Sequence, residues 1–289
     1  MTLDSIVAGR TNGGRQLFTA ITALSLIIMY MPVLYLLFAS LNPDEQLRVV
    51  VPIHYSLTWY VALLDDHRLF SALEESLFIG FATAVMATPI GLSAAIAYRA
   101  MTRMRGIFLL IILSAVFVPG TIEGLGLSVM LRLVRVSPSW VTVTIGHLLW
   151  TLPFSVTVSL IGLSTVKPST VEAARDLGAG RLRAFVDVTL PLIRGSLISS
   201  FVFAFLLSLN EHARAYYLVG RQNTLPLYMF GAMNSGVSPT IYAFSGAVIA
   251  LSFAAVALIC GADQSELLDS QVFPAPLLEA NGAFHQFLE

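Results

Sequence analysis

The chain has 289 residues, of which 56% are hydrophobic and only 11% are charged, and its formal net charge is −1. An average soluble domain carries about 25% charged residues, so this composition and a mean hydropathy of +0.80 exclude an ordinary soluble protein. The near-neutral charge provides no basic field that would attract nucleic acid. We therefore expect an integral membrane protein that contacts lipid and has no nucleic-acid partner.

Six segments are long and apolar enough to cross a bilayer as helices of about 20 residues. They lie at roughly 17–41, 76–98, 107–131, 140–163, 196–219 and 240–260, and they predict an all-α membrane protein with about six spans. The first segment lacks the short apolar core and cleavage site of a signal peptide, so we expect it to remain as an anchor. We divide the chain into a tail at 1–16, a transmembrane domain at 17–261 and an acidic tail at 262–289, to which we assign no role.

Lys and Arg are distributed unevenly between the predicted spans. Ten of the 16 fall on the side that includes both termini, five fall on the other side, and Arg214 falls within the fifth span. Because basic residues concentrate in cytoplasmic loops, we expect both termini to face the cytoplasm. The long loop at 164–194 is then cytoplasmic, and the loop at about 42–75 is external.

The external loop contains an amphipathic stretch in which Trp59 and Tyr60 are suited to the membrane interface. The neighbouring Asp65, Asp66 and His67 have the side chains of metal ligands. Adjacent ligands on one stretch lack the fixed spacing of a metal site, so we predict a solvated loop and no bound metal.

The cytoplasmic loop contains a charged, alanine-rich stretch, VEAARDLGAG, at 171–180. Ser169 and Glu172 have the spacing of a capping box, and Gly178 is placed to end a helix in a left-handed conformation. This pattern predicts a helix at about 169–177 and a second at about 181–189, which should stop before Pro191. Helices this short need a surface to pack against.

The same loop carries a spaced motif. Glu172, Ala173, Ala174 and Gly178, followed after nine residues by Val188, Leu190 and Pro191, resemble the EAA motif of binding-protein-dependent ABC importer permeases, where Ile is common at the position of Val188. In that family the loop forms coupling helices that dock on an ATPase subunit. The resemblance implies a type I importer fold and assigns the ATPase contact to Glu172, Ala173, Ala174, Asp176, Gly178, Leu190 and Pro191.

The resemblance extends over about residues 20–260. Three stretches, AYRAMTRMRG, SLNEHARAYYLVG and TLPLYMFGAMNSGVSP, are most similar to the spermidine/putrescine branch, whose relatives also import opines, amino-acid derivatives and iron complexes. The resemblance implies half of a translocation pathway for a small solute such as a polyamine or a related cation. It implies as partners a homologous second permease, two ATPase subunits and an external solute-binding protein. Two departures are Asn210 and Glu211, where the branch tends to have two adjacent acids, and the longer acidic tail.

The chain itself has no signs of catalysis. A P-loop needs a lysine after its glycines, but the single lysine, Lys167, is followed by proline and has no glycine run before it. Ser, His and acidic residues are scattered without a nucleophile-elbow pattern. We therefore expect no catalytic residue and no cofactor on this chain, with ATP and Mg on the partner ATPase.

Polar residues inside the spans are candidates for the translocation pathway, because an ionisable group in the hydrocarbon region usually faces protein or water. These candidates are Glu123, which lies among Gly120, Gly124 and Gly126, and the adjacent Asn210 and Glu211. Alternatively, Glu211 pairs with Arg214 at i and i+3. We interpret His147 as a structural residue that hydrogen-bonds a neighbouring helix.

Two other classes of function are compatible with six spans. A secondary transporter would keep a coupling-ion site within the spans and need no ATPase, but it gives the cytoplasmic hairpin no purpose. A membrane scaffold would not need glycines, prolines and acids inside its spans. The sequence therefore favours an importer permease.

Overall fold

The computed structural model describes residues 12–43, 54–235 and 239–270, and within these ranges it describes side chains from residue 17 to residue 254. Every regular element in these ranges is helical, which confirms the all-α prediction. Most of the tail predicted at 1–16 and residues 271–289 of the acidic tail lie outside the described residues. The chain divides into two compact units, Asp66–Val237 and a smaller unit formed by Met1–Asp65 with Ser238–Glu289.

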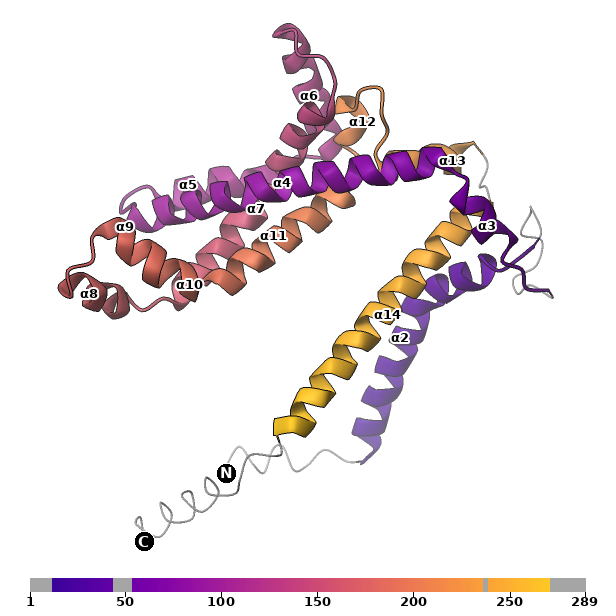
Figure 1. Cartoon of the computed structure of the whole chain (residues 1–289), viewed down its shortest axis with the longest axis horizontal. Helices are drawn as coiled ribbons and strands as arrows, with labels where there is room; N and C mark the ends of the chain where they lie inside the picture. Colours follow the sequence, from indigo (N-terminus) through magenta and orange to yellow (C-terminus); the bar gives the residue numbers. More distant parts are fainter. Residues whose placement is uncertain (1–11, 44–53, 236–238, 271–289) are drawn as a thin grey trace. The chain divides into compact units, whose positions relative to one another are not determined.

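The smaller unit contains helices α2 (Asn12–Ala39), α3 (Thr58–Leu64) and α14 (Pro239–Ser270), with α14 packed against the other two (Figure 1). Gly246 makes this approach possible, since a Cβ there would lie 2.5 Å from both the Ser40 and Tyr60 hydroxyl oxygens. Those two hydroxyl groups hydrogen-bond each other at 2.7 Å. Trp59 donates to the backbone oxygen of Asn42 at 3.0 Å, so both aromatic residues that we predicted at the membrane interface also tie α3 to the end of α2.

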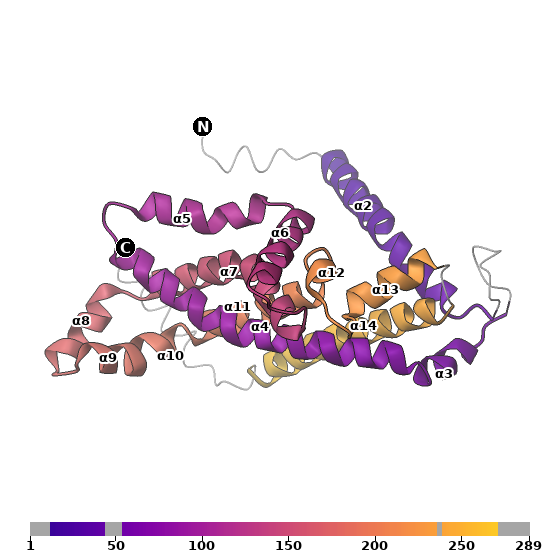
Figure 2. The same cartoon turned by 90° about the horizontal axis from the view of Figure 1, so that it is seen from above.

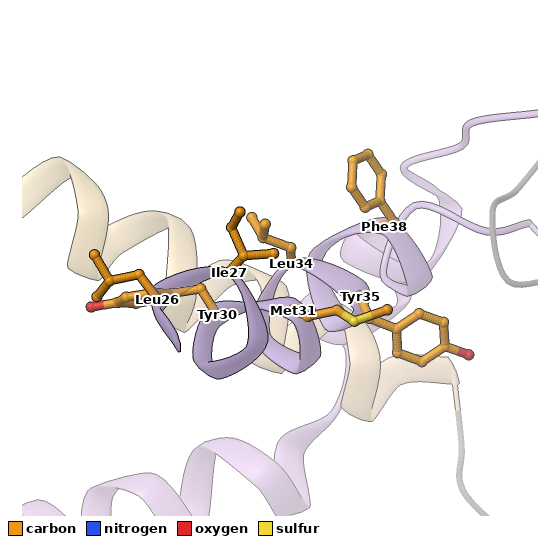
Figure 3. Close-up of a pocket in the computed structure, with 7 residues that line it drawn as sticks. All are labelled: Leu26, Ile27, Tyr30, Met31, Leu34, Tyr35 and Phe38. Atoms are coloured by element: carbon orange, nitrogen blue, oxygen red, sulfur yellow. The ribbon is translucent and has the colours of Figure 1, made fainter. Parts of the chain in front are cut away.

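One side of α2 is a continuous apolar surface. Figure 3 shows its side chains, which come from this helix alone: Leu26, Ile27, Tyr30, Met31, Leu34, Tyr35 and Phe38. Most of them are more than two-fifths exposed. Such a surface suits lipid tails, which are as apolar as leucine side chains.

The larger unit is built on three long helices that run side by side in Figures 1 and 2, α4 (His67–Ala100), α7 (Trp140–Thr165) and α11 (Arg194–Leu209). The remaining elements are shorter. They are α5 (Arg105–Ser114), the 3₁₀ turn η1 (Ala115–Phe117), α6 (Gly120–Leu133), α8 (Pro168–Asp176), α9 (Arg181–Ala184), the π-helical turn η2 (Phe185–Thr189), α10 (Leu190–Leu192), α12 (Ala215–Leu218) and α13 (Leu225–Asn234).

Small residues let the three long helices approach closely. A Cβ at Gly91 of α4 would lie 2.7 Å from the Ser155 Cβ of α7, and one at Gly162 of α7 would lie 2.5 Å from the Ser196 Cβ of α11. The same faces carry further small, buried residues: Thr83, Ala84, Ala87, Ala95, Thr151, Ser159, Ser200, Ala204 and Ser208. In lipid there is no hydrophobic driving force for helices to associate, so interfaces between membrane helices depend on close van der Waals packing of this kind.

Three of the six predicted spans are helices of sufficient length and apolarity, at Leu17–Ala39, His67–Ala100 and Trp140–Thr165. The predicted third span corresponds to a bent helix pair, and the predicted fifth begins within Arg194–Leu209, the second half of another bent pair. The described apolar part of the sixth is Pro239–Ala254. The prediction of one continuous helix at 107–131 is wrong, because Arg105–Phe117 and Gly120–Leu133 meet at 100°. Val118 has an extended backbone (ψ 124°) immediately before Pro119, as expected for a residue that the following proline ring forces out of the helical region.

The predicted span at 196–219 is also interrupted. α11 ends at Leu209, and α12 resumes only at Ala215. Between them, Asn210 donates from its side chain to the Leu206 oxygen at 2.9 Å, and the backbone nitrogen of Arg214 donates to Glu211 at 3.0 Å. Local side-chain bonds of this kind offer the backbone an alternative to the helical ladder.

The predicted external loop at 42–75 is too long, because α4 begins at His67. Asp66 caps this helix by accepting from the Leu69 backbone nitrogen at 3.1 Å, and its other carboxylate oxygen accepts from Tyr228 of α13 at 2.6 Å. Asp66, considered above as a possible metal ligand, thus connects α13 to the start of α4.

Candidate functional site

The hairpin at 164–194 begins with α8, whose start differs from the prediction. Lys167 is the N-cap residue and Pro168 is the first helical residue, and no side chain caps the helix. The predicted capping box of Ser169 and Glu172 is therefore wrong. Proline at the first position needs no amide hydrogen and already has a helical φ, so it begins the helix one residue earlier.

The end of α8 follows the prediction. Gly178 has a φ of +93°. Its backbone nitrogen donates to the Arg175 backbone oxygen at 2.9 Å, and the Ala179 backbone nitrogen donates to the Ala174 backbone oxygen at 3.1 Å. These two bonds form a Schellman motif, which satisfies carbonyl groups left free at the helix end and favours glycine at the left-handed position. The motif turns the chain sharply into α9.

The second half of the hairpin is longer than predicted. A helical segment runs from Arg181 to Leu192, through Pro191, and bends by 69° before α11. The π-helical turn η2 precedes Pro191, and the Ile193 nitrogen still donates to Thr189 at 3.1 Å. A wider π turn shifts the bonding pattern, so the helix tolerates a proline, and the prediction that it stops before Pro191 is wrong.

Both ends of the hairpin are anchored in the larger unit. Val166 and Ile193 are buried with Ala95 of α4 and Leu163 of α7, and Arg99 donates to the Leu163 oxygen at 2.5 Å. In Figures 1 and 2 α8 and α9 project beyond the end of the long helices, away from α13. The hairpin is therefore a fixed projection at one end of this unit.

Most of the residues that the EAA motif singles out are accessible. Glu172, Ala173, Asp176, Gly178 and Pro191 are exposed, whereas Ala174 and Leu190 are partly buried. The two most exposed apolar side chains of the tip are Leu177 and Leu182, which are 90% and 76% exposed. The sequence placed Leu182 on the apolar side of the second hairpin helix but did not single out Leu177. Their signal was an apolar residue on each side of the Gly178 turn in an otherwise polar stretch.

A second candidate site lies where α11 is interrupted. The Arg214 guanidinium contacts two acids: Nη1 lies 3.0 Å from Glu211 Oε2, and Nη2 lies 2.6 Å from Glu123 Oε2. Its Nε also donates to Glu123 Oε2 at 2.8 Å, and the Trp150 ring lies 4.7 Å from the guanidinium carbon. We call Glu123, Trp150, Glu211 and Arg214 the Arg214 cluster.

The Arg214 cluster is buried against helices α6 and α7. The Arg214 side chain is only 4% exposed. A Cβ at Gly120 would lie 2.8 Å from Arg214 Nη1, and one at Gly124 would lie 2.9 Å from Arg214 Cα. The two glycines, four residues apart, thus leave the space that Arg214 fills. Burying charges is costly unless they are paired with good geometry, and these contacts supply the pairing.

A buried hydrogen-bonded chain lies across the three long helices. His147 Nδ1 of α7 is 2.6 Å from the Ser208 hydroxyl of α11, which donates to Thr83 of α4 at 3.4 Å. The prediction that His147 bonds a neighbouring helix is confirmed. Its Nε2 is buried with no partner among the described residues.

The structure brings two of the three candidate pathway residues together. Glu123 and Glu211 meet through Arg214, although Glu123 and Arg214 are 91 positions apart, and no sequence signal linked them. The alternative pairing of Glu211 with Arg214 is present. Asn210 is exposed, and its side chain donates to the Leu206 oxygen at the end of its own helix. A role in the pathway stays a prediction for all three residues. In the described ranges no three His, Cys, Asp or Glu residues group in a way that could hold a metal ion.

Comparison with known proteins agrees with this architecture. Residues 80–264 match the model of the family described as binding-protein-dependent transport system inner membrane component. The putrescine transport system permease protein PotI of Escherichia coli K12 is 31% identical over 264 residues, which cover 87% of this chain and 93% of PotI. The spermidine/putrescine transport system permease protein PotC of Haemophilus influenzae is 27% identical over 80% of this chain and 90% of its own length.

Among solved structures, a bacterial ABC transporter involved in alginate import has a similar fold, with a TM-score of 0.61 and 19% identity over 88% of this chain and 98% of that chain. A second structure, of an alginate ABC transporter in complex with a pentasaccharide-bound periplasmic protein, has a TM-score of 0.60 at 15% identity over 85% of this chain and 93% of that chain. At this identity the likeness concerns the fold alone. The family match and the likeness to PotI along nearly the whole chain identify the protein as a member of the inner membrane permease family of binding-protein-dependent ABC importers.

Proposed function

We propose that this permease forms half of the translocation pathway for a polyamine or a related small cation. The observation that carries the proposal is the 31% identity to PotI over 87% of this chain, since PotI and PotC are named for putrescine and spermidine transport. Two carboxylates at an interrupted helix, Glu123 and Glu211, are compatible with a cationic solute because opposite charges attract strongly where the dielectric constant is low.

ATP hydrolysis is expected on a separate subunit that docks on the 164–194 hairpin. The tip combines the exposed apolar Leu177 and Leu182 with charged residues around the Gly178 turn. An apolar centre with a polar rim is typical of protein interfaces. The Lys and Arg distribution would place this hairpin and both termini in the cytoplasm, where ATP is available to the partner.

The complete importer is expected to contain a homologous second permease, two ATPase subunits with ATP and Mg, and an external solute-binding protein. Native mass spectrometry of the purified active importer tests this composition. The expected mass is that of a complex with one copy of this permease, one non-identical permease and two ATPase subunits. An active complex that lacks a second permease chain would contradict it.

The coupling assignment is tested by co-purifying the permease with its ATPase. Reversing the charge at the exposed Glu172 (Glu172→Lys) should abolish co-purification while the permease still inserts. The control Glu74→Lys makes the same charge change near the start of α4, also at an exposed residue, and should leave co-purification intact. Unchanged ATPase binding by Glu172→Lys would contradict the assignment.

The solute assignment is tested with the complete importer in proteoliposomes. Uptake of labelled putrescine or spermidine that requires the binding protein and ATP is expected. Absence of polyamine uptake in an importer that has binding-protein-stimulated ATPase activity would contradict the solute class. Uptake by the permease alone, driven by an ion gradient, would instead support a secondary transporter.

A further inference from the structure

The two acids of the Arg214 cluster use their oxygens differently. Both carboxylate oxygens of Glu211 accept hydrogen bonds: Oε1 from the Arg214 backbone nitrogen and Oε2 from Nη1, each at 3.0 Å. In Glu123 only Oε2 contacts Arg214, and it accepts from both Nε and Nη2. Glu123 Oε1 has no hydrogen-bond partner within the described parts of the chain, and the Glu123 side chain is 14% exposed against 9% for Glu211.

The charges of the Arg214 cluster do not balance. With both acids ionised, one guanidinium faces two carboxylates, so the cluster has a net charge of −1. Arg214 and Glu211 alone would form a neutral pair. A further carboxylate in a membrane-embedded region is costly, and its free oxygen remains able to accept from a second cation.

The position of Glu123 suits a group that meets a solute. It lies in the first turn of α6, four residues after Pro119 and the 100° bend, and Arg214 lies in the interruption of α11. Interrupted helices in the hydrocarbon region persist where they are buried in protein or line a water-filled cavity, and transporters bind ions and solutes at such interruptions.

Two groups on α7, one inside the Arg214 cluster and one beside it, are suited to a polar ligand. The Trp150 ring already contacts one cation, the Arg214 guanidinium, and an indole face attracts ammonium groups as well. His147, three residues before Trp150 and so on the same side of α7, is 1% exposed and has an unpartnered Nε2. Buried polar atoms without a partner are rare and call for an unseen one.

We infer that Glu123 is the carboxylate that accepts the ammonium group of the cationic solute during passage, through its free Oε1. Glu211 is a positioning residue, which holds Arg214 and through it the Glu123 side chain. This inference rests on the proposed cationic solute. It assigns different roles to Glu123 and Glu211, which the sequence indicated only as two candidates for the same pathway.

The test compares two double variants with equal net charge. Glu211→Gln with Arg214→Gln leaves Glu123 as the single charge of the Arg214 cluster, and Glu123→Gln with Arg214→Gln leaves Glu211. The complete importer is reconstituted for each, and putrescine uptake at saturating binding protein is divided by the amount of assembled importer. Both double variants lose the guanidinium that holds the carboxylates, so they are compared with each other. We expect uptake to be about tenfold or more higher when Glu123 remains than when it is removed, as for a lost hydrogen bond to a charged group.

The single variant Glu123→Gln provides a second measurement, because it leaves the neutral Arg214–Glu211 pair intact. It should assemble with its partners, retain binding-protein-stimulated ATPase activity and lose putrescine uptake, whereas Glu123→Asp should restore part of the uptake. Equal uptake by the two double variants, wild-type uptake by Glu123→Gln, or failure of Glu123→Gln to assemble would each overturn the inference. A wild-type importer that carries no cation would overturn the proposed function instead, before any variant is compared.

Discussion

The 164–194 hairpin and the Arg214 cluster are stabilised in opposite ways. The hairpin tip is exposed, and its turn depends on backbone bonds between residues three to five positions apart. The Arg214 cluster is buried, and its defining contact joins residues 91 positions apart. A local turn needs one residue with the right conformational freedom, whereas a buried ion cluster needs every partner at once.

This difference has a consequence for mutations. In the hairpin, a substitution changes the shape of a surface, and its effect should appear mainly in the binding of a partner. In the Arg214 cluster, a substitution leaves a charge without compensation in a low-dielectric region, and its effect should appear first in the stability of the permease itself.

Arg214→Gln should destabilise the permease by about 3–5 kcal/mol, because it leaves two buried carboxylates without their cation. Thermal unfolding of the purified permease in detergent measures the loss. Adding Glu211→Gln removes one of the stranded charges and should restore part of the stability. If Arg214→Gln unfolds at the wild-type temperature, the guanidinium does not stabilise this region.

Gly124→Ala should cost about 1–3 kcal/mol through overpacking. A Cβ at this position would lie 2.9 Å from Arg214 Cα and 3.1 Å from its backbone oxygen, and neither atom belongs to a flexible side-chain end. Gly126→Ala on the same helix is the matched control, since a Cβ there meets nothing within 4 Å. Equal unfolding temperatures for the two variants would show that α6 does not hold Arg214 closely.

The sequence predicted the hairpin better than the Arg214 cluster, because the hairpin depends on neighbouring residues and the cluster on residues far apart in the chain. Gly178 indicated its own left-handed conformation, because the residue type and the local helix end determine it. The start of α8 was placed one residue late because the capping-box spacing of Ser169 and Glu172 competed with proline at the first position. Both features depend on a few adjacent residues.

The Arg214 cluster could be predicted only in part. The i, i+3 spacing suggested that Glu211 pairs with Arg214. Glu123 was a candidate only because it is an acid among glycines within a predicted span. Nothing in the sequence indicated that Gly120 and Gly124 make room for Arg214. The two interruptions, after Phe117 and Leu209, lie within apolar stretches, and hydropathy averages over them. Long-range packing determines the contacts of the Arg214 cluster, whereas both interruptions have local causes, which are Pro119 and the side-chain bonds of Asn210 and Glu211.

Gly178→Val should weaken ATPase binding by about tenfold, because a β-branched residue at a φ of +93° costs roughly 1–2 kcal/mol and distorts the turn. Gly180→Val is the control, since Gly180 has an ordinary φ of −63° and open space around it. Titration of the ATPase onto immobilised permease measures both. Equal affinities would mean that the shape of the turn does not matter for docking.

The smallest effect should come from Arg183→Gln in the hairpin, which makes the same chemical change as Arg214→Gln. Arg183 pairs with Asp187 at 3.3 Å, but the two side chains are 79% and 58% exposed. Water and salt screen such a pair, so its loss should change the stability of the isolated permease by less than about 0.5 kcal/mol. Thermal unfolding of both arginine variants at low and high salt gives the comparison directly: a large, salt-insensitive loss for Arg214 and almost none for Arg183. Similar losses for the two variants would mean that burial is not what distinguishes the two regions, and the argument that Arg214 compensates costly buried carboxylates would fail with it.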